Sequence, residues 1–364
     1  MKIKTLIVAI SQLLYLTVCS GETTFNPATA SEKPDGLTLN TSKIVKSTAY
    51  KSPFDDHEAF IEFMKGSKFA TPPWSDHELR SSFPKELYDS CFDPNQTLFS
   101  EVIYQSPNGL TKGWTIKTKG SKNKLPIVVF NRGGFAKWGR IVPFELLSLC
   151  RVAQQGFMVL ASDFRSPKDD SKNASEIEAG KRDKTDLGYG DVNDSFYLID
   201  AVTRANANLD ANNIAVWGFS RGTTLAALMT TRSDSVRVVI MQGMVANLVE
   251  DKRREEFDEH VYPLLVDGWA SLPLSEQNAL LSGISPIELV TKIKGRPHFL
   301  ILHGAKDSRT SAQDALHYAR TLLDENHSVE FHLYPESGHV LSGSYNQYLN
   351  EVIESLNKHL SKPR

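Results

Sequence analysis

From about residue 98 to the end of the chain, short apolar runs alternate with longer segments in which apolar residues recur at helical spacing. Most of the runs are apolar at successive positions, which is typical of strands buried on both faces of a parallel sheet. The runs are 127–130, 157–160, 214–217, 236–240, 299–302 and 329–333, and the helical segments are 143–155, 192–205, 221–231, 312–323 and 345–360. Their alternation predicts an α/β protein with a doubly wound, mostly parallel sheet and helices on both faces.

Two segments depart from this alternation. Residues 98–104 and 114–119 alternate apolar and polar positions, which favours an antiparallel hairpin at the edge of the sheet. Residues 246–284 contain two or three helical pieces between successive strands. We expect this insertion to form a small helical cap over the carboxyl ends of the strands, where open α/β sheets bind their ligands.

The N-terminal residues have the order of a secretory signal. Lys2 and Lys4 precede an apolar stretch that ends in small residues, and this stretch is too short and interrupted to predict a membrane span. We therefore expect a signal peptide at 1–20 and export to the periplasm or the medium, with no integral membrane domain after it. In an alternative interpretation, Leu16–Cys19 is a bacterial lipobox and Cys19 carries a lipid anchor.

The segments that follow the signal carry weaker patterns. Residues 21–50 are rich in Thr, Ser, Asn, Lys and Pro, which indicates a flexible linker. Residues 51–97 contain helix-like pieces at 55–64 and 84–88 and form an N-terminal extension of no obvious type. The predicted α/β domain is then 98–364.

The composition narrows the classes of partner. The chain has 364 residues, with 41 Lys or Arg against 43 Asp or Glu, so nothing indicates binding to nucleic acid. The spacing of Cys and His is not that of a structural metal site, and we expect no metal or cofactor. Cys91 and Cys150 could pair in an oxidising compartment, but the apolar run 144–152 favours Cys150 as a small packed hydrophobe. The oligomeric state stays open.

The pentapeptide Gly218-Phe219-Ser220-Arg221-Gly222 stands between an apolar run and a helical segment. A serine on a sharp strand-to-helix turn needs Gly two residues away on each side, because larger side chains would collide there. Such a turn lifts the hydroxyl out of the sheet and points the helix N-terminus at an anion formed beside it. Ser220 is therefore our candidate nucleophile.

A serine hydroxyl needs a general base, and the base needs an acid to orient it. Asp307 follows the apolar run 299–302 after a short turn, and His339 follows the run 329–333 after a loop. Both should reach the sheet edge that carries Ser220, and Ser, Asp, His is the order that this type of fold requires. We predict a catalytic triad of these three residues.

Acyl transfer also develops an oxyanion, which needs hydrogen-bond donors already in place. One predicted donor is the backbone N–H of Arg221, at the start of the helix after the nucleophile. The second should come from the loop after the run 127–130, where Gly133 or Gly134 lets the backbone approach the substrate carbonyl.

With these motifs together, residues 98–361 resemble the prolyl oligopeptidase family of serine hydrolases. The segments that carry the resemblance are 131–134, 162–165, 188–194, 218–222, Ser285-Pro286, the spacing His303-Gly304-x-x-Asp307, and Gly338-His339. The resemblance implies the α/β-hydrolase fold and serine hydrolysis. Peptidases of this family usually carry a long β-propeller before the catalytic domain, and the residues before 98 are too few for one. The resemblance therefore implies serine hydrolysis better than peptide hydrolysis.

Several charged residues near strand ends are candidates for binding substrate. Arg132 stands where dipeptidyl-peptidase relatives carry an oxyanion-binding Tyr, so we expect the Gly133 N–H rather than a side chain to donate. For Arg165, Asp191 and Asp194 we favour a structural ion pair, with recognition of a substrate charge as the alternative.

We predict from the sequence an exported serine hydrolase that works through an acyl-enzyme. A serine peptidase comes first because of the family resemblance, and a carboxylesterase of the same fold is the alternative. The substrate is then a peptide or another small acyl compound. A hydrolase-fold binding protein without catalysis is the alternative from another class, and the intact triad argues against it.

Overall fold

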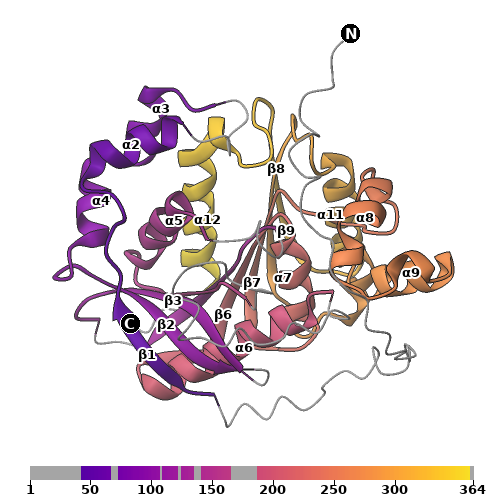
Figure 1. Cartoon of the computed structure of the whole chain (residues 1–364), viewed down its shortest axis with the longest axis horizontal. Coiled ribbons are helices and arrows are strands. Elements are labelled where there is room, and N and C mark those ends of the chain that lie inside the picture. Colours follow the sequence, from indigo (N-terminus) through magenta and orange to yellow (C-terminus); the bar gives the residue numbers. More distant parts are fainter. Residues whose placement is uncertain are drawn as a thin grey trace, which may run out of the picture. The chain divides into compact units, whose positions relative to one another are not determined.

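A nine-stranded mixed sheet forms the centre of the computed structural model, which describes residues 42–66, 73–106, 109–121, 124–134, 141–164 and 187–360 (Figure 1). All of these residues belong to one unit, Thr38–Arg364. The sheet is mostly parallel and has helices on both faces, as the sequence predicts, so the predicted fold class is confirmed.

The strand order is β1-β2-β3-β5-β4-β6-β7-β8-β9. The strands are β1 (Ile44–Ala49), β2 (Thr97–Ser106), β3 (Gly109–Thr118), β4 (Leu125–Asn131), β5 (Met158–Ser162), β6 (Leu209–Phe219), β7 (Val236–Gln242), β8 (His298–Gly304) and β9 (Ser328–Tyr334). The pairs from β1 to β5 through β2 and β3 are antiparallel, and the others are parallel. Every residue of β4, β5 and β8 is buried, which confirms the interpretation of their apolar runs.

Helices cover the two faces of this sheet. On one face, α5 (Pro143–Ala153) and α12 (Tyr345–His359) pack on the strands. On the other lie α6 (Tyr189–Ala205), α7 (Gly222–Thr230) and α11 (Ala312–Asp324), with the short α10 (Pro286–Leu289) beside α7. These helices coincide with the predicted helical segments to within a few residues, except α10.

The N-terminal extension is a further layer of this domain. Its helices are α2 (His57–Lys65), α3 (Asp76–Ser82) and α4 (Lys85–Phe92), and they lie beside α5 and α12 (Figure 1). Trp74 Nε1 donates a hydrogen bond of 2.9 Å to the Ser342 carbonyl, and the Phe83 and Tyr345 rings lie 4.7 Å apart. Trp74 and Phe83 are both buried, so the extension completes the core on this face.

A disulfide bond joins the extension to the α/β domain. Cys91 of α4 is bonded to Cys150 of α5, and both side chains are fully buried. The expectation that Cys150 packs as an unpaired hydrophobe is therefore wrong. The apolar surroundings were interpreted correctly, but they hold a second cysteine that the sequence places 59 residues away.

The predicted linker 21–50 ends in regular structure. Strand β1 pairs antiparallel with β2, from Ile44 opposite Tyr104 to Ala49 opposite Ser100. Without β1, the backbone N–H and C=O groups at the outer edge of β2 would be unpaired. β1 forms hydrogen bonds with them, and such backbone pairing needs no particular side chains. The predicted hairpin of β2 and β3 is present, but it is not the edge of the sheet. Residues 1–41 lie outside the described residues, and with them the predicted signal peptide and Cys19.

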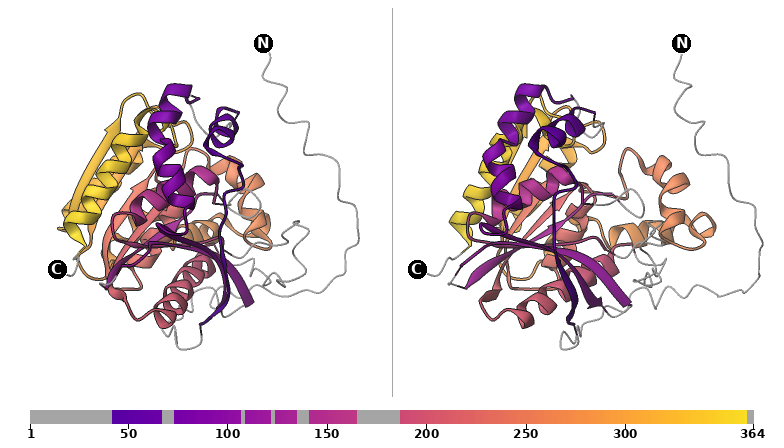
Figure 2. Two further views of the ribbon diagram at one scale, coloured as in Figure 1. Left: turned by 90° about the vertical axis from the view of Figure 1, so that its left-hand side faces the viewer. Right: turned by 60° about the vertical axis from the view of Figure 1, so that its left-hand side comes forward.

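The insertion at 246–284 has the predicted helical character. It leaves the carboxyl end of β7 and contains α8 (Arg254–His260), two 3₁₀ turns (Tyr262–Leu264 and Trp269–Ser271) and α9 (Leu274–Ser282). Figure 2 shows these helices, in orange, projecting to one side of the domain. None of the described helices is long and apolar enough to cross a membrane.

Candidate active site

Ser220 lies in a sharp turn between β6 and α7. Its backbone has a positive φ of 53°, a conformation that non-glycine residues rarely adopt outside functional turns. A Cβ atom on Gly218 would lie 2.4 Å from the Gly222 carbonyl oxygen, and one on Gly222 would lie 1.9 Å from the Asn131 oxygen. The two glycines therefore permit the close approach that the sequence pattern predicts. The Ser220 N–H donates to the Gln242 carbonyl at 2.9 Å, which ties the turn to β7.

The structure brings the three predicted triad residues together. His339 Nε2 lies 2.9 Å from Ser220 Oγ, and His339 Nδ1 lies 2.8 Å from Asp307 Oδ2. Asp307 follows β8 and His339 follows β9, and the loops that carry them are joined by the Lys306 N–H, which donates to the Ser337 carbonyl at 3.0 Å. The three side chains thus form one continuous hydrogen-bonded chain from carboxylate to hydroxyl.

The Asp307 carboxylate is completely buried and has several hydrogen-bond donors. Its Oδ1 accepts the backbone N–H groups of Arg309 (2.8 Å) and Thr310 (3.0 Å), and its Oδ2 accepts the Thr310 hydroxyl at 2.6 Å. Burial would raise the pKa of Asp307, but the hydrogen bonds from His339 and Thr310 outweigh it and hold that pKa well below its ordinary value. Asp307 is therefore a carboxylate wherever the protein is folded near neutral pH.

The loop 131–134 is the predicted oxyanion loop, and it lies against the nucleophile. A Cβ atom on Gly133 would lie 3.1 Å from Ser220 Cβ, so the loop backbone passes directly beside the serine. Arg132 donates to the Gly133 carbonyl at 3.1 Å, and Arg221 donates to the Gly134 carbonyl at 3.4 Å. Because a peptide group is planar and trans, fixing the Gly133 carbonyl also fixes the Gly134 N–H in the opposite direction. Two arginines therefore set the orientation of the loop.

The predicted substrate-binding arginines have different outcomes. Arg132 is 3% exposed, and its second guanidinium contact is the Asp163 carbonyl at 2.6 Å, so it holds backbone and is not open to a ligand. Burial lowers the pKa of Arg132 to about 10, which leaves it charged at neutral pH. Arg165 lies outside the described residues. Asp191 forms an ion pair with Arg221, a partner that the sequence analysis did not name.

Three residues to which the sequence analysis gave no role contact the triad, although His303 stood in the motif that carries the family resemblance. Thr310 donates to Asp307, His303 lies behind it, and Gly243 packs on the base, where a Cβ atom would lie 3.2 Å from His339 Nδ1. The sequence did carry a signal for two of them. Thr310 follows Asp307 by three residues, a spacing at which an aspartate side chain can accept hydrogen bonds from the turn that it begins. His303 precedes Asp307 by four residues.

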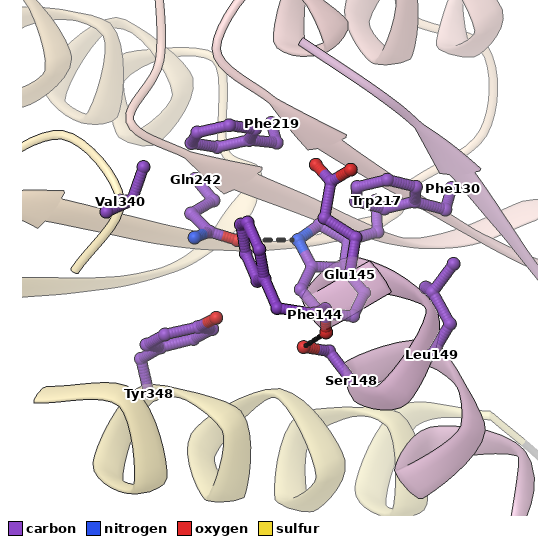
Figure 3. A pocket seen from close by; sticks show the side chains of 10 residues that line it. All are labelled: Phe130, Phe144, Glu145, Ser148, Leu149, Trp217, Phe219, Gln242, Val340 and Tyr348. Carbon is purple, nitrogen blue, oxygen red and sulfur yellow. Dashed lines mark hydrogen bonds between the residues drawn. The ribbon is translucent and has the colours of Figure 1, made fainter. Parts of the chain in front are cut away.

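A pocket lies beside the triad, between the sheet and helices α5 and α12 (Figure 3). Phe219 and Val340, the chain neighbours of the nucleophile and the base, line it together with Glu145. Glu145 accepts the Val142 N–H at 2.8 Å, and burial raises its pKa to about 7. The pocket therefore combines aromatic walls with a carboxyl group that is only partly ionised near neutral pH. Within the described ranges, no three His, Cys, Asp or Glu side chains are grouped to hold a metal ion.

The strand order and the turn that presents Ser220 define the class of protein, an α/β-hydrolase. Residues 144–362 match the family model described as the prolyl oligopeptidase family. The chain therefore belongs to the prolyl oligopeptidase family, whose members are serine peptidases.

Curated relatives and solved structures agree with this family. The chain is 27% identical over 313 residues to a protein of Talaromyces marneffei named probable dipeptidyl-aminopeptidase B, covering 84% of this chain and 30% of that protein. It is 25% identical over 309 residues to acylamino-acid-releasing enzyme 1 of Oryza sativa, covering 79% and 38%. The chain thus spans about a third of the length of these relatives.

Two solved structures share the fold. The acylaminoacyl peptidase of Pyrococcus horikoshii superposes with a TM-score of 0.60 at 17% identity, covering 74% of this chain and 42% of that one. A puromycin-hydrolyzing peptidase of Mycobacterium tuberculosis gives a TM-score of 0.56 at 16% identity, covering 72% and 40%. At these identities the similarity establishes the fold alone.

Proposed function

We propose that this protein is an exported serine peptidase that cleaves peptide bonds through an acyl-enzyme. The observation that carries the proposal is the hydrogen-bonded chain Ser220–His339–Asp307, with distances of 2.9 Å and 2.8 Å between the reacting atoms. Family membership supports peptides as the substrate class. The names of the two curated relatives point the same way, because one is named an aminopeptidase and the other an enzyme that releases acylamino acids.

In the proposed mechanism Ser220 Oγ attacks the scissile carbonyl while His339 Nε2 takes its proton. Asp307 accepts from His339 Nδ1, which keeps the other ring nitrogen free as the base, and it stabilises the imidazolium that forms. His339 then gives the proton to the leaving amine, and the acyl group stays on Ser220. Water repeats the sequence, with His339 again as base, and releases the acid.

The proposed oxyanion hole has two sides. The Arg221 N–H lies at the start of α7, where the helix dipole favours negative charge. We assign the other side to a loop N–H from Gly133 or Gly134, because this loop passes beside Ser220. The contacts of the two arginine side chains with the loop carbonyls hold these donors in place before substrate arrives.

We also propose export, with the mature chain beginning after residue 20. The buried Cys91–Cys150 bond supports this, because structural disulfides form and persist in oxidising compartments. The alternative is a lipid anchor on Cys19. Fractionation of cells that express the full chain, followed by mass spectrometry of the mature N-terminus, separates the two. An intact Met1 in the cytosolic fraction would reject export in either form.

A fluorophosphonate probe tests the enzyme directly. We expect it to label the wild type and the control S271A, which loses an exposed serine in the insertion, and to leave S220A unlabelled. An unlabelled wild type would favour the non-catalytic binding protein. Aminoacyl-anilides and short-chain p-nitrophenyl esters then divide peptidase from esterase. Turnover of esters with none of any anilide or peptide would reject the peptidase and leave the carboxylesterase.

A further inference from the structure

A second histidine lies behind the triad carboxylate. His303 is the penultimate residue of β8 and has no exposed surface. Its Nε2 lies 3.5 Å from Asp307 Oδ2 and 3.4 Å from Thr310 Oγ1. The same Thr310 hydroxyl is 2.6 Å from Asp307 Oδ2, the oxygen that also accepts from His339.

The hydrogens of this cluster can be assigned from its donors and acceptors. A carboxylate only accepts, so the single hydrogen of the Thr310 hydroxyl points to Asp307 over the shorter contact. The hydroxyl lone pairs then face His303 Nε2, which must carry a hydrogen to avoid two opposed lone pairs. His303 Nδ1 has no hydrogen-bond partner in the described structure, as suits the unprotonated nitrogen of a neutral ring. Burial lowers the pKa of His303, which keeps the ring neutral.

We propose that His303 and Thr310 are a pair of positioning residues that fix the Asp307 carboxylate and limit how tightly it holds the proton of His339. This role rests on the proposed serine-hydrolase function. The Thr310 hydroxyl draws charge away from the Oδ2 oxygen that faces His339 Nδ1, and the His303 N–H strengthens that effect by donating to the hydroxyl oxygen. Asp307 Oδ2 is then a weaker acceptor for the His339 Nδ1–H, and less negative charge faces the imidazolium that forms during catalysis.

Charges on other elements also act on this cluster. Lys252 and Arg253, at the start of the insertion, exert their positive charge on His303 and Asp307 respectively. His339 is the titratable group that contacts the Asp307 carboxylate from β9 and its following loop. Since neither Lys252 nor Arg253 changes in the variants below, their effect is constant across the comparison.

The test compares two pairs of variants by the pH dependence of kcat/KM, on the anilide or ester that the wild type turns over fastest. T310V and H303M remove the donors, while T310S keeps the hydroxyl and H303Q places an amide N–H near the position of Nε2. We expect kcat to fall about tenfold in T310V, which loses a hydrogen bond to a charged group, and about threefold in H303M, which loses one to a neutral hydroxyl. KM should stay within about twofold, and the acid limb should move to higher pH by roughly half a unit. T310S and H303Q should stay close to wild type.

An unchanged acid limb, or a shift to lower pH, would overturn the proposal, because a residue that only fills space does not change the proton affinity of the base. Should H303M not fold, as judged by circular dichroism, the nearly isosteric T310V decides the question. The low-field proton NMR signal of His339 Nδ1–H is a readout that needs no substrate, and its titration should shift in the same direction. Fluorophosphonate labelling of the wild type separates failure of this proposal from failure of the proposed function.

Discussion

The bond between Cys91 and Cys150 gives a prediction whose size follows from the fold. Reducing it in the folded protein removes one covalent bond and no atoms, so the buried surfaces of α4 and α5 stay the same size. The loss therefore comes mainly from the unfolded chain, which is no longer closed into a loop. Any comparison with a cysteine variant would add a cavity effect to this, since both side chains are fully buried.

The magnitude depends on the length of that loop. The two cysteines are 59 residues apart. The chain-entropy relation for a loop of this length gives about 4 kcal/mol at 25 °C. This is a large part of the 5–15 kcal/mol or so that stabilises a typical domain, so the extension should detach more readily once the bond is reduced.

Urea unfolding of oxidised and reduced protein, followed by tryptophan fluorescence, measures the difference. The double variant C91A/C150A, treated with and without reductant, shows whether the reductant acts elsewhere. We expect the unfolding midpoint to fall on reduction of the wild type only. A difference below about 1 kcal/mol, within the scatter of such measurements, would refute the argument. So would a thiol count under denaturing, non-reducing conditions in which both cysteines react.

Three further predictions concern single side chains. Burial raises the pKa of Glu145 from 4.5 to about 7, so the unfolded chain ionises first and the free energy of unfolding falls as pH rises through that window. Glu145→Gln should therefore add up to about 3 kcal/mol to the free energy of unfolding at pH 8 and nothing at pH 4, and an equal gain at both would contradict this. Gly222→Ala should cost about 3 kcal/mol or more in urea unfolding, because its Cβ would meet the Asn131 oxygen, whereas Gly66→Ala, whose Cβ meets nothing closer than 3.6 Å, serves as a near-neutral control. Arg132→Met should lower kcat about tenfold with KM little changed, because the oxyanion loop loses its support; Arg132→Lys should lose less, and an unchanged kcat in the Met variant would show that the loop needs no such support.

Much of the fold was predictable because its strands are buried on both faces. All four residues of the run 299–302 are apolar, and a strand that is apolar on both faces fits only in the buried centre of a sheet. The turn at Ser220 was predictable because sterics demand glycine at 218 and 222 whatever the rest of the chain does. The order of Ser220, Asp307 and His339 then followed from the order of the strands.

The parts that the sequence did not predict depend on contacts distant in the chain. In β1, five of six residues are exposed, so its side chains do not alternate between a buried and an exposed face. Its position is set by hydrogen bonds to the backbone of β2, which the sequence does not reveal. Cys150 is bonded to Cys91 because α4 packs on α5, and the sequence pattern does not predict that packing. His303 belongs to an apolar strand in the sequence, and only the turn that folds Thr310 back onto Asp307 reveals its second role.

The position of β4 in the sheet has a consequence for exchanging parts between relatives. It comes early in the chain, yet it lies between β5 and β6, so these two strands reach each other only through it. The stretch 144–362 that matches the family begins after β4 ends. Expressed alone, that stretch would leave the sheet split in two, and the serine would face a gap where the oxyanion loop belongs. Recombination at the boundary of the sequence match would therefore cut through the active site itself.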